Sequence, residues 1–216
     1  MKSVPPSYCR DGWREESNRT IKYFVLSIIV MILPIYTYGQ PVLRQETEEI
    51  DPDYPNLSQI IVDMWDTLAK SRGVGLAAPQ VGLPIRMAII DLDCISEDEP
   101  QYQGYKRVFI NPYIEEVDET NKDTQEEGCL SLPGLSEKVT RPTRIRVSYQ
   151  DENFVEHDEW VDGFLARVMQ HEFDHLDGVV YTDHLKGLRR QLMAPKLKQL
   201  VRGEFSADYK VKPLRK

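Results

Sequence analysis

The stretch VMQHEFDHL, residues 168–176, places Glu172 directly after His171 and three residues before His175. Apolar residues recur at intervals of three and four ahead of it, which predicts a helix over residues 161–176. Positions i and i+4 lie on one face of a helix, so both imidazoles can reach the same metal ion. The glutamate between them lies close enough to act on a water molecule without ligating the ion. The stretch therefore predicts a helix that carries a metal site.

A catalytic metal site needs a third protein ligand and leaves one position open. Two zincin-type patterns supply that ligand downstream, but Tyr181 stands where one of them has a histidine. The other needs an acid, and Glu204, the only glutamate after the helix, lies in a basic stretch. Cys129 offers an alternative, because a thiolate is a strong ligand for zinc or iron(II). We therefore predict that Cys129, His171 and His175 bind one divalent metal ion, with a zincin-type metallopeptidase as the alternative function.

Two further blocks accompany the histidine block in a fixed order along the chain. They are GVGLAAPQVG at residues 73–82 and EGCLS at residues 127–131, ahead of QHEFDHL at residues 170–176. The three blocks together resemble the peptide deformylase family of bacterial type, and weaker matches extend the resemblance over residues 31–183. The resemblance implies a metallohydrolase that removes the formyl group from the N-terminal formylmethionine of newly made polypeptides and releases formate.

The resemblance also implies roles for single residues around the ion. Glu172 would act as the general acid/base of the reaction. The Gln80 side chain and the Leu130 backbone N–H would donate to the oxyanion that develops as the formyl carbon is attacked. The cofactor would be one divalent metal ion. Iron(II) is favoured, with zinc as the alternative, since two imidazoles and a thiolate suit both.

The substrate site is expected beside the glycine-rich block. Gly75 has no side chain, so a peptide backbone can approach it closely, and the resemblance implies that the peptide binds there as an added strand. Val74, Leu130 and Val168 are apolar and adjacent to the expected chemistry. We therefore predict that these three residues contribute to the pocket for the substrate methionine.

The remaining periodicity predicts several strands and two more helices. Strand-like runs occupy residues 86–92, 107–110 and 144–149, and helical spacing occupies residues 56–70 and 185–200. We expect Asn56 or Ser58 to cap the first of these helices, Asn111-Pro112 to end the second strand, and Pro195 to interrupt the last helix. Because strands come first and the metal-site helix comes late, we predict an α+β fold. In it, short antiparallel strands pack around a central HExxH helix, and a further helix follows at the C-terminus.

Charge is distributed unevenly along the chain. The whole sequence carries a net charge of −8, which argues against general nucleic-acid binding and against DNA as a partner. Residues 184–216, however, contain ten lysines and arginines and only two acids. Such a basic helix and tail is either an ordinary solvated face or a docking surface for a polyanion. Because the implied substrates leave the ribosome, whose surface is largely RNA, we hypothesise that this segment docks there.

Thirty residues precede the first stretch that reads as part of a folded domain. The apolar run at residues 23–36 is too short for a comfortable transmembrane helix, which needs about 20 residues, and no small-residue cleavage site follows it. We favour Met31 as the native start over a signal peptide or an anchor. Residues 1–30 would then be an extension outside the native protein, and residues 31–216 a single catalytic domain.

Three cysteines form no disulfide framework, so we expect a reducing, cytoplasmic location without membrane association.

Overall fold

The computed structural model of the protein describes residues 31–214. The predicted N-terminal extension, residues 1–30, lies outside the described residues. Three α-helices occur in the described part: α1 (Leu57–Ser71), α2 (Gly163–Leu176) and α3 (Gly187–Val201). None of them is both long enough and apolar enough to cross a membrane.

Within residues 31–214, nine strands form three sheets, and two of these sheets are antiparallel. The largest has the order β2-β3-β4-β7-β8, with β2 at Gly75–Ala77, β3 at Met87–Asp91, β4 at Lys106–Val117, β7 at Arg144–Gln150 and β8 at Glu156–Asp162. Strands β5 (Lys122–Gly128) and β6 (Ser136–Pro142) form a separate antiparallel pair. The exception is a short parallel pair between β1 (Ile35–Tyr36) and β9 (Val211–Lys212), near the two ends of the described chain.

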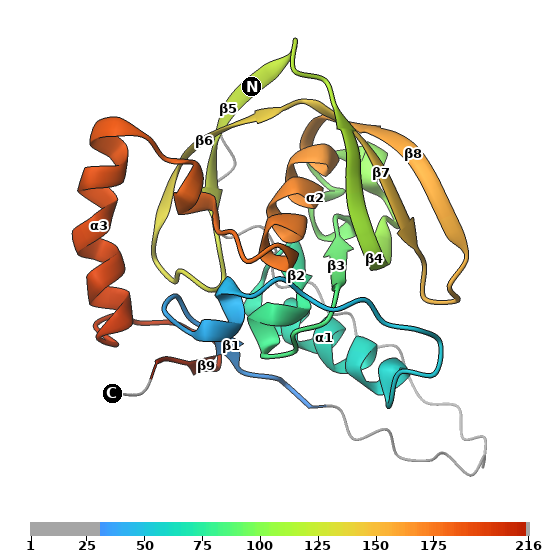
Figure 1. The fold of residues 1–216 in the computed structure, drawn as a ribbon, viewed down its shortest axis with the longest axis horizontal. Helices are drawn as coiled ribbons and strands as arrows, with labels where there is room; N and C mark the ends of the chain where they lie inside the picture. The colour runs from blue at the N-terminus through green and yellow to red at the C-terminus, as the bar shows by residue number, and fades with distance from the viewer. Residues whose placement is uncertain (1–30, 215–216) are drawn as a thin grey trace.

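Helix α2 lies in the middle of the molecule, between the β5–β6 pair and strands β4, β7 and β8 (Figure 1). Its Phe173 packs edge-on against Phe109 of β4, with ring centroids 5.7 Å apart. Met169, one turn earlier, is also fully buried in this cluster. The mixed α/β architecture with antiparallel sheets that the sequence predicts is thus confirmed.

The two faces of the large sheet are covered by different helices. Alternate residues of a strand point to opposite faces. In β3, Ala88 and Ile90 belong to the cluster around α2, whereas Met87 and Ile89 belong to the cluster that contains Met64 of α1. Strand β3 is therefore buried on both sides, which explains its continuous apolar sequence.

Helix α3 stands on the outer side of the β5–β6 pair (Figure 1). Met193 and Leu200 are its buried residues, and they pack in a cluster with Val139 of β6. The interruption predicted at Pro195 is wrong, because the helix runs through this residue. Both Pro195 and Gln191, whose carbonyl loses its helical donor, are exposed, so water can replace the missing hydrogen bond.

Strand β4 continues past the predicted stop at Asn111-Pro112, so that prediction is also wrong. Asn111 has a positive φ of 50°, and the register against β7 shifts between Ile110 and Tyr113. The Asn111 side chain donates to the Ile50 carbonyl at 2.8 Å and accepts from the Ile50 N–H at 2.9 Å. These side-chain hydrogen bonds stand at the point where the β4–β7 pairing shifts register. The strand then continues beyond Asn111, as a strand does after a β-bulge.

Strand β8, with the sequence EHDEWVD, escapes prediction from the sequence because most of its residues are charged. It is one of the two edge strands of the large sheet, and Val161 is its one buried residue. The helix predicted over residues 56–70 is present as α1, but Asn56 makes no side-chain cap and instead adopts a left-handed conformation with φ of 58°.

Candidate metal centre and active-site pocket

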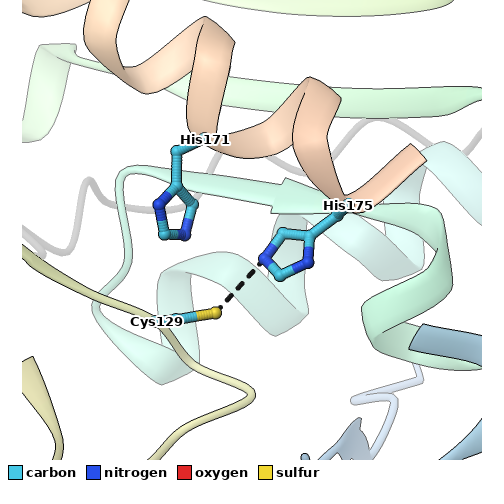
Figure 2. A group of neighbouring side chains, drawn as sticks. All are labelled: Cys129, His171 and His175. Carbon is cyan, nitrogen blue, oxygen red and sulfur yellow. Dashed lines mark hydrogen bonds between the residues drawn. The ribbon is translucent and has the colours of Figure 1, made fainter. Parts of the chain in front are cut away.

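Two elements bring the three predicted ligands together. His171 and His175 lie on successive turns of α2 and point toward Cys129, which follows directly after β5 (Figure 2). Cys129 Sγ lies 3.2 Å from His175 Nε2. One ligand atom from each of the three residues lies within 4.8 Å of the other two. The helix spacing sets the histidine pair, and the packing of β5 beside α2 adds the thiol.

A divalent metal ion fits this arrangement. Ligands bound at the roughly 2.0–2.3 Å typical of zinc with nitrogen and sulfur lie about 3.5 Å apart, close to the observed separation of Cys129 Sγ and His175 Nε2. His171 Nδ1 lies 3.0 Å from Glu127 Oε2, which leaves Nε2 for an ion. Glu172 Oε2 is buried and has no hydrogen-bond partner among the described residues. The donor set and the spare buried acceptor both suit a cation with an attached water.

The charges around Cys129 favour a thiolate. Burial raises the pKa of the thiol, but the His175 imidazole and the hydrogen bonds from both histidines lower it further, to about 5. Burial alone would lower the pKa of His171, yet Cys129 and Glu127 raise it well above its ordinary value. Both pKa shifts favour the charged forms, a thiolate at Cys129 and an imidazolium at His171. Binding of a metal ion would release the imidazolium proton.

Glu172 carries a buried carboxyl next to the three candidate ligands. Its side chain is 4 % exposed, and burial raises the pKa of the carboxyl to about 7 against the opposing effect of His171 and His175. The carboxylate lies directly over Gly75 of β2, where any side chain would overlap its atoms. Position 75 therefore requires glycine because the Glu172 carboxylate lies so close to its backbone.

The side-chain amide of Gln80 points its nitrogen toward Cys129. It lies in a 3-10 helix, Ala78–Val81, and is 1 % exposed. Its Oε1 accepts a hydrogen bond from the Ala77 N–H at 2.8 Å. Its Nε2 lies 3.5 Å from Cys129 Sγ and 3.4 Å from Ser131 Oγ. Because the oxygen is engaged by the backbone, the amide is oriented with its N–H groups toward the candidate centre.

A cavity of about 360 Å³ opens beside these groups. Most of the residues predicted for the site line it: Val74, Gly75, Gln80, Cys129, Leu130, Val168, His171 and Glu172. Of the predicted set, His175 does not line the cavity and is 1 % exposed. The cavity wall also includes Asp208 and Tyr209 from the C-terminal segment, which sequence reasoning does not link to the site.

A buried ionic network behind the histidines was not predicted. Glu127 is 5 % exposed and accepts hydrogen bonds from Arg141 at 2.7 and 3.0 Å and from Arg167 at 2.5 Å. Arg141 also donates to Asp174 at 2.8 Å, and His184 lies 2.8 Å from the same carboxylate oxygen. Charged residues on a strand read as exposed, so nothing in the local pattern distinguishes Arg141 as buried.

The network holds His171 in place. Burial opposes ionisation of Glu127, but His171 and Arg141 keep the pKa of this carboxyl well below its usual range. The ionised Glu127 therefore accepts the Nδ1–H of His171 and directs Nε2 toward Cys129 and His175. An outer hydrogen bond of this kind fixes the tautomer and orientation of a metal-binding histidine.

Comparisons with known proteins agree on one family. A family model described as polypeptide deformylase matches residues 32–191. The peptide deformylase of Christiangramia forsetii is 44% identical over 190 residues, which cover 84% of this chain and 96% of that protein. The peptide deformylase of Cytophaga hutchinsonii is 41% identical over 187 residues, covering 86% of this chain and 100% of that protein. A crystal structure of the Plasmodium falciparum peptide deformylase superposes with a TM-score of 0.70 at 36% identity, covering 78% of this chain and 95% of that one.

Proposed function

The chain belongs to the polypeptide deformylase family, and from this premise we propose that Cys129, His171 and His175 hold the metal ion of its reaction. The family removes the N-terminal formyl group from nascent peptides, so the chain is a hydrolase of protein biosynthesis and N-terminal methionine processing. The observation that carries the ligand assignment is the convergence of one donor atom from each residue within 4.8 Å. Helix α2 is then the central HExxH helix of the fold.

Glu172 is the general acid/base in this proposal. Cys129, His171 and His175 would hold a divalent cation, which would supply Lewis-acid chemistry by lowering the pKa of a bound water and polarising the formyl carbonyl. The Glu172 carboxylate takes a proton as water attacks the formyl carbon, and it delivers a proton to the amine as the C–N bond breaks. The products are formate and a free N-terminal amine. The buried Oε2 without a partner and the raised pKa of the carboxyl support this role.

The oxyanion of the tetrahedral intermediate is stabilised by two neutral donors. The Gln80 Nε2–H and the Leu130 backbone N–H donate to the oxygen that gains charge. The support for Gln80 is the engagement of its Oε1 by the Ala77 N–H, which fixes the amide with its nitrogen toward Cys129. The support for Leu130 is its position next to Cys129 in the cavity wall.

The methionine side chain of the substrate occupies the apolar part of the cavity. Val74, Leu130 and Val168 contribute its walls, and the peptide extends as a strand beside Gly75. Val168 lies one turn before His171 on α2, which places it on the cavity side of the helix. Main-chain hydrogen bonds to a strand edge accept many sequences, which suits a broad set of nascent chains.

Formate release tests the proposal directly. Wild type loaded with iron(II) under anaerobic conditions should release formate from formyl-Met-Ala, and Cys129→Ala should lose both bound metal and activity. A zincin-type peptidase is not favoured, because the family model and the relatives are deformylases; such an enzyme would stay metallated in Cys129→Ala. Absence of formate from the metal-loaded wild type would refute the proposed chemistry.

The ion used in cells is proposed to be iron(II), with zinc as the alternative. Two imidazoles and a thiolate accept both ions, so the ligand set does not separate them. Metal analysis after anaerobic purification, combined with activity measured before and after exposure to air, distinguishes the two. Iron with oxygen-sensitive activity supports the proposal, and stoichiometric zinc with full activity in air contradicts it.

We further propose that the basic helix α3 and the tail after it dock on ribosomal RNA. The described part of α3 and the residues before it expose the side chains of Lys186, Arg189, Arg190, Lys196 and Lys198. Truncation is a poor test, because the chain after α3 returns to pair β9 with β1. Arg189→Glu combined with Arg190→Glu should weaken ribosome binding at low salt and leave cleavage of formyl-Met-Ala unchanged. Unchanged ribosome affinity in the double variant would contradict the proposed docking of α3.

Residues 31–216 are proposed to form the single catalytic domain, with Met31 as the native start and a cytoplasmic location. The family match begins at residue 32. The Met31 backbone N–H donates to the carboxylate of Asp63 at 3.0 Å, and Asp63 is 6 % exposed. An α-ammonium group at this position would make a stronger, charge-assisted bond. The mass of the native protein tests this, and a mature N-terminus well upstream of Met31 would contradict it.

A further inference from the structure

The C-terminal segment returns from α3 to the neighbourhood of the candidate active site. Strand β9 pairs with β1, with Val211 opposite Ile35. The Ile35 N–H donates to the Lys210 carbonyl at 2.8 Å, and Gln40 Nε2 donates to the carbonyls of Lys212 and Pro213 at 3.1 and 2.9 Å. The backbone on the C-terminal side of Tyr209 is therefore held by the N-terminal part of the domain.

Tyr209 lies where the C-terminal segment contacts the loop that begins at Cys129 and continues through Leu130. Its hydroxyl donates to the Leu130 carbonyl at 2.8 Å, and its half-buried ring packs, as Leu130 does, against the buried cluster that contains Leu68 and Leu76. Together with Asp208 it lines the cavity that contains Cys129 and Glu172. The family model ends at residue 191, so this wall comes from a part of the chain outside the family match.

The loop around Leu130 is restrained from several directions. The Ser131 carbonyl accepts from the Tyr38 N–H at 2.8 Å, and Cys129 is fixed by its contact with His175. The Leu130 side chain packs closely over Gly73. The peptide that carries the Leu130 carbonyl is planar, so a hydrogen bond to this oxygen restricts rotation about the bonds of Leu130 itself. The orientation of the Leu130 N–H depends on those rotations.

We propose that Tyr209 is a positioning residue, whose hydroxyl holds Leu130 so that its backbone N–H is aimed at the oxyanion in the cavity. The inference rests on the proposed role of the Leu130 N–H as an oxyanion donor. Preorganised donors contribute because they need no reorientation during the reaction. Loss of the phenol hydroxyl frees the Leu130 peptide without removing any ligand, base or donor from the site.

Tyr209→Phe tests this inference, because it removes the hydroxyl and keeps the ring. The single-turnover rate of formate release should fall by about five- to tenfold, less than the loss of an oxyanion donor itself costs. KM for formyl-Met-Ala should stay within about twofold of wild type, and the metal content should be unchanged. Replacement of Tyr209 by 4-aminophenylalanine, which restores a donor at the same position, should recover most of the rate.

The matched control is Tyr36→Phe. Tyr36 lies on the partner strand β1 and accepts a hydrogen bond from Lys212 at 2.8 Å, away from Leu130. It should keep the wild-type rate. Inactive wild type would refute the proposed function rather than this inference. If wild type and control are active, an unchanged rate in Tyr209→Phe overturns the inference. A rate lost only in proportion to lost metal, or no recovery with 4-aminophenylalanine in a folded protein, overturns it as well.

Discussion

At the scale of single residues, the candidate site consists of ionisable side chains that are buried, and burial shifts their pKa values. The Glu172 carboxyl is buried over Gly75, and Cys129 lies beside two imidazoles. Burial raises the pKa of the glutamate toward neutrality, where a carboxylate works best as a general base near pH 7. The same burial would suppress the thiolate, but the neighbouring imidazoles outweigh it.

Glu172→Gln removes the base and keeps the shape of the side chain. We expect the single-turnover rate of formate release to fall by about 10²- to 10⁴-fold, the usual contribution of a general acid/base. Metal content should be unchanged, because the carboxylate is not among the three proposed ligands. The exposed Glu156→Gln on β8 provides the control. A glutamine variant that retains more than about a tenth of the activity would show that the proton is moved by another group.

Cys129 should be a thiolate at neutral pH even without metal. In metal-free protein we expect its alkylation by iodoacetamide, followed by peptide mapping, to reach half its maximal rate near pH 5. The rate should fall below that pH as the thiol is protonated, and metal affinity should fall with it. His175→Ala removes the largest lowering influence, so its midpoint should move up toward the ordinary range. A wild-type midpoint of 8 or above would contradict the proposed electrostatics.

At the scale of elements, the β5–β6 pair and α2 are joined by buried charges rather than by apolar contacts alone. Glu127, near the end of β5, accepts a hydrogen bond from Arg141 of β6 and lies within hydrogen-bond distance of His171 of α2. Arg141 in turn reaches Asp174 on the same helix. The strands are thereby fixed beside the helix, and with them the position of Cys129 relative to the histidines.

Arg141→Ala should destabilise the protein far more than an equivalent surface change. Removing Arg141 takes a buried cation from Glu127 and Asp174, which keep only Arg167, His171 and His184 as partners among the described residues, and costs about 3–5 kcal/mol of unfolding free energy. The matched control is Arg146→Ala, which also loses two ion pairs, to Glu116 and Asp158, but on an exposed face of the sheet. That change should cost about 0–1 kcal/mol. Urea denaturation measures both, and equal losses would rule out a structural role for the buried network.

At the scale of the whole molecule, the proposed ion would bridge parts of the chain that are far apart in sequence. Cys129 follows β5, and both histidines belong to α2. A ligand that binds only the folded state stabilises it by about 2.7 kcal/mol at a hundred times its dissociation constant. The stability of the domain should therefore depend on metal.

Chelation of the ion should lower the melting temperature by about 5–10 °C, given the usual scaling for a domain of this size. The measurement is a thermal melt with and without 1,10-phenanthroline, each repeated after metal is restored. Cys129→Ala serves as the control, since its melting temperature should no longer respond to chelator. An identical response of wild type and variant would indicate that the chelator acts elsewhere.

The sequence alone identified the features that depend on local spacing. His171 and His175 share a helix face because they are four residues apart, and that relation needs no knowledge of the rest of the fold. Helix α1 and strands β3 and β7 follow from apolar periodicity in the same way. Where a local rule meets a special environment, the prediction is wrong. Strand β4 passes through Asn111 because a distant backbone group pairs with its side chain, and α3 passes through Pro195 because that site is exposed.

Tertiary structure decided everything that requires two distant segments to meet. The close approach of Cys129, already a predicted ligand, to the histidines, the burial of Glu127 and Arg141, and the contact of Tyr209 with Leu130 join residues 14 to 79 positions apart. No periodicity encodes such contacts, because a charged strand residue or a tyrosine near the C-terminus has the same local pattern whether it is buried or exposed. The sequence by itself therefore determined the chemical groups of the candidate metal centre. Only the fold determined how those groups are oriented, charged and enclosed.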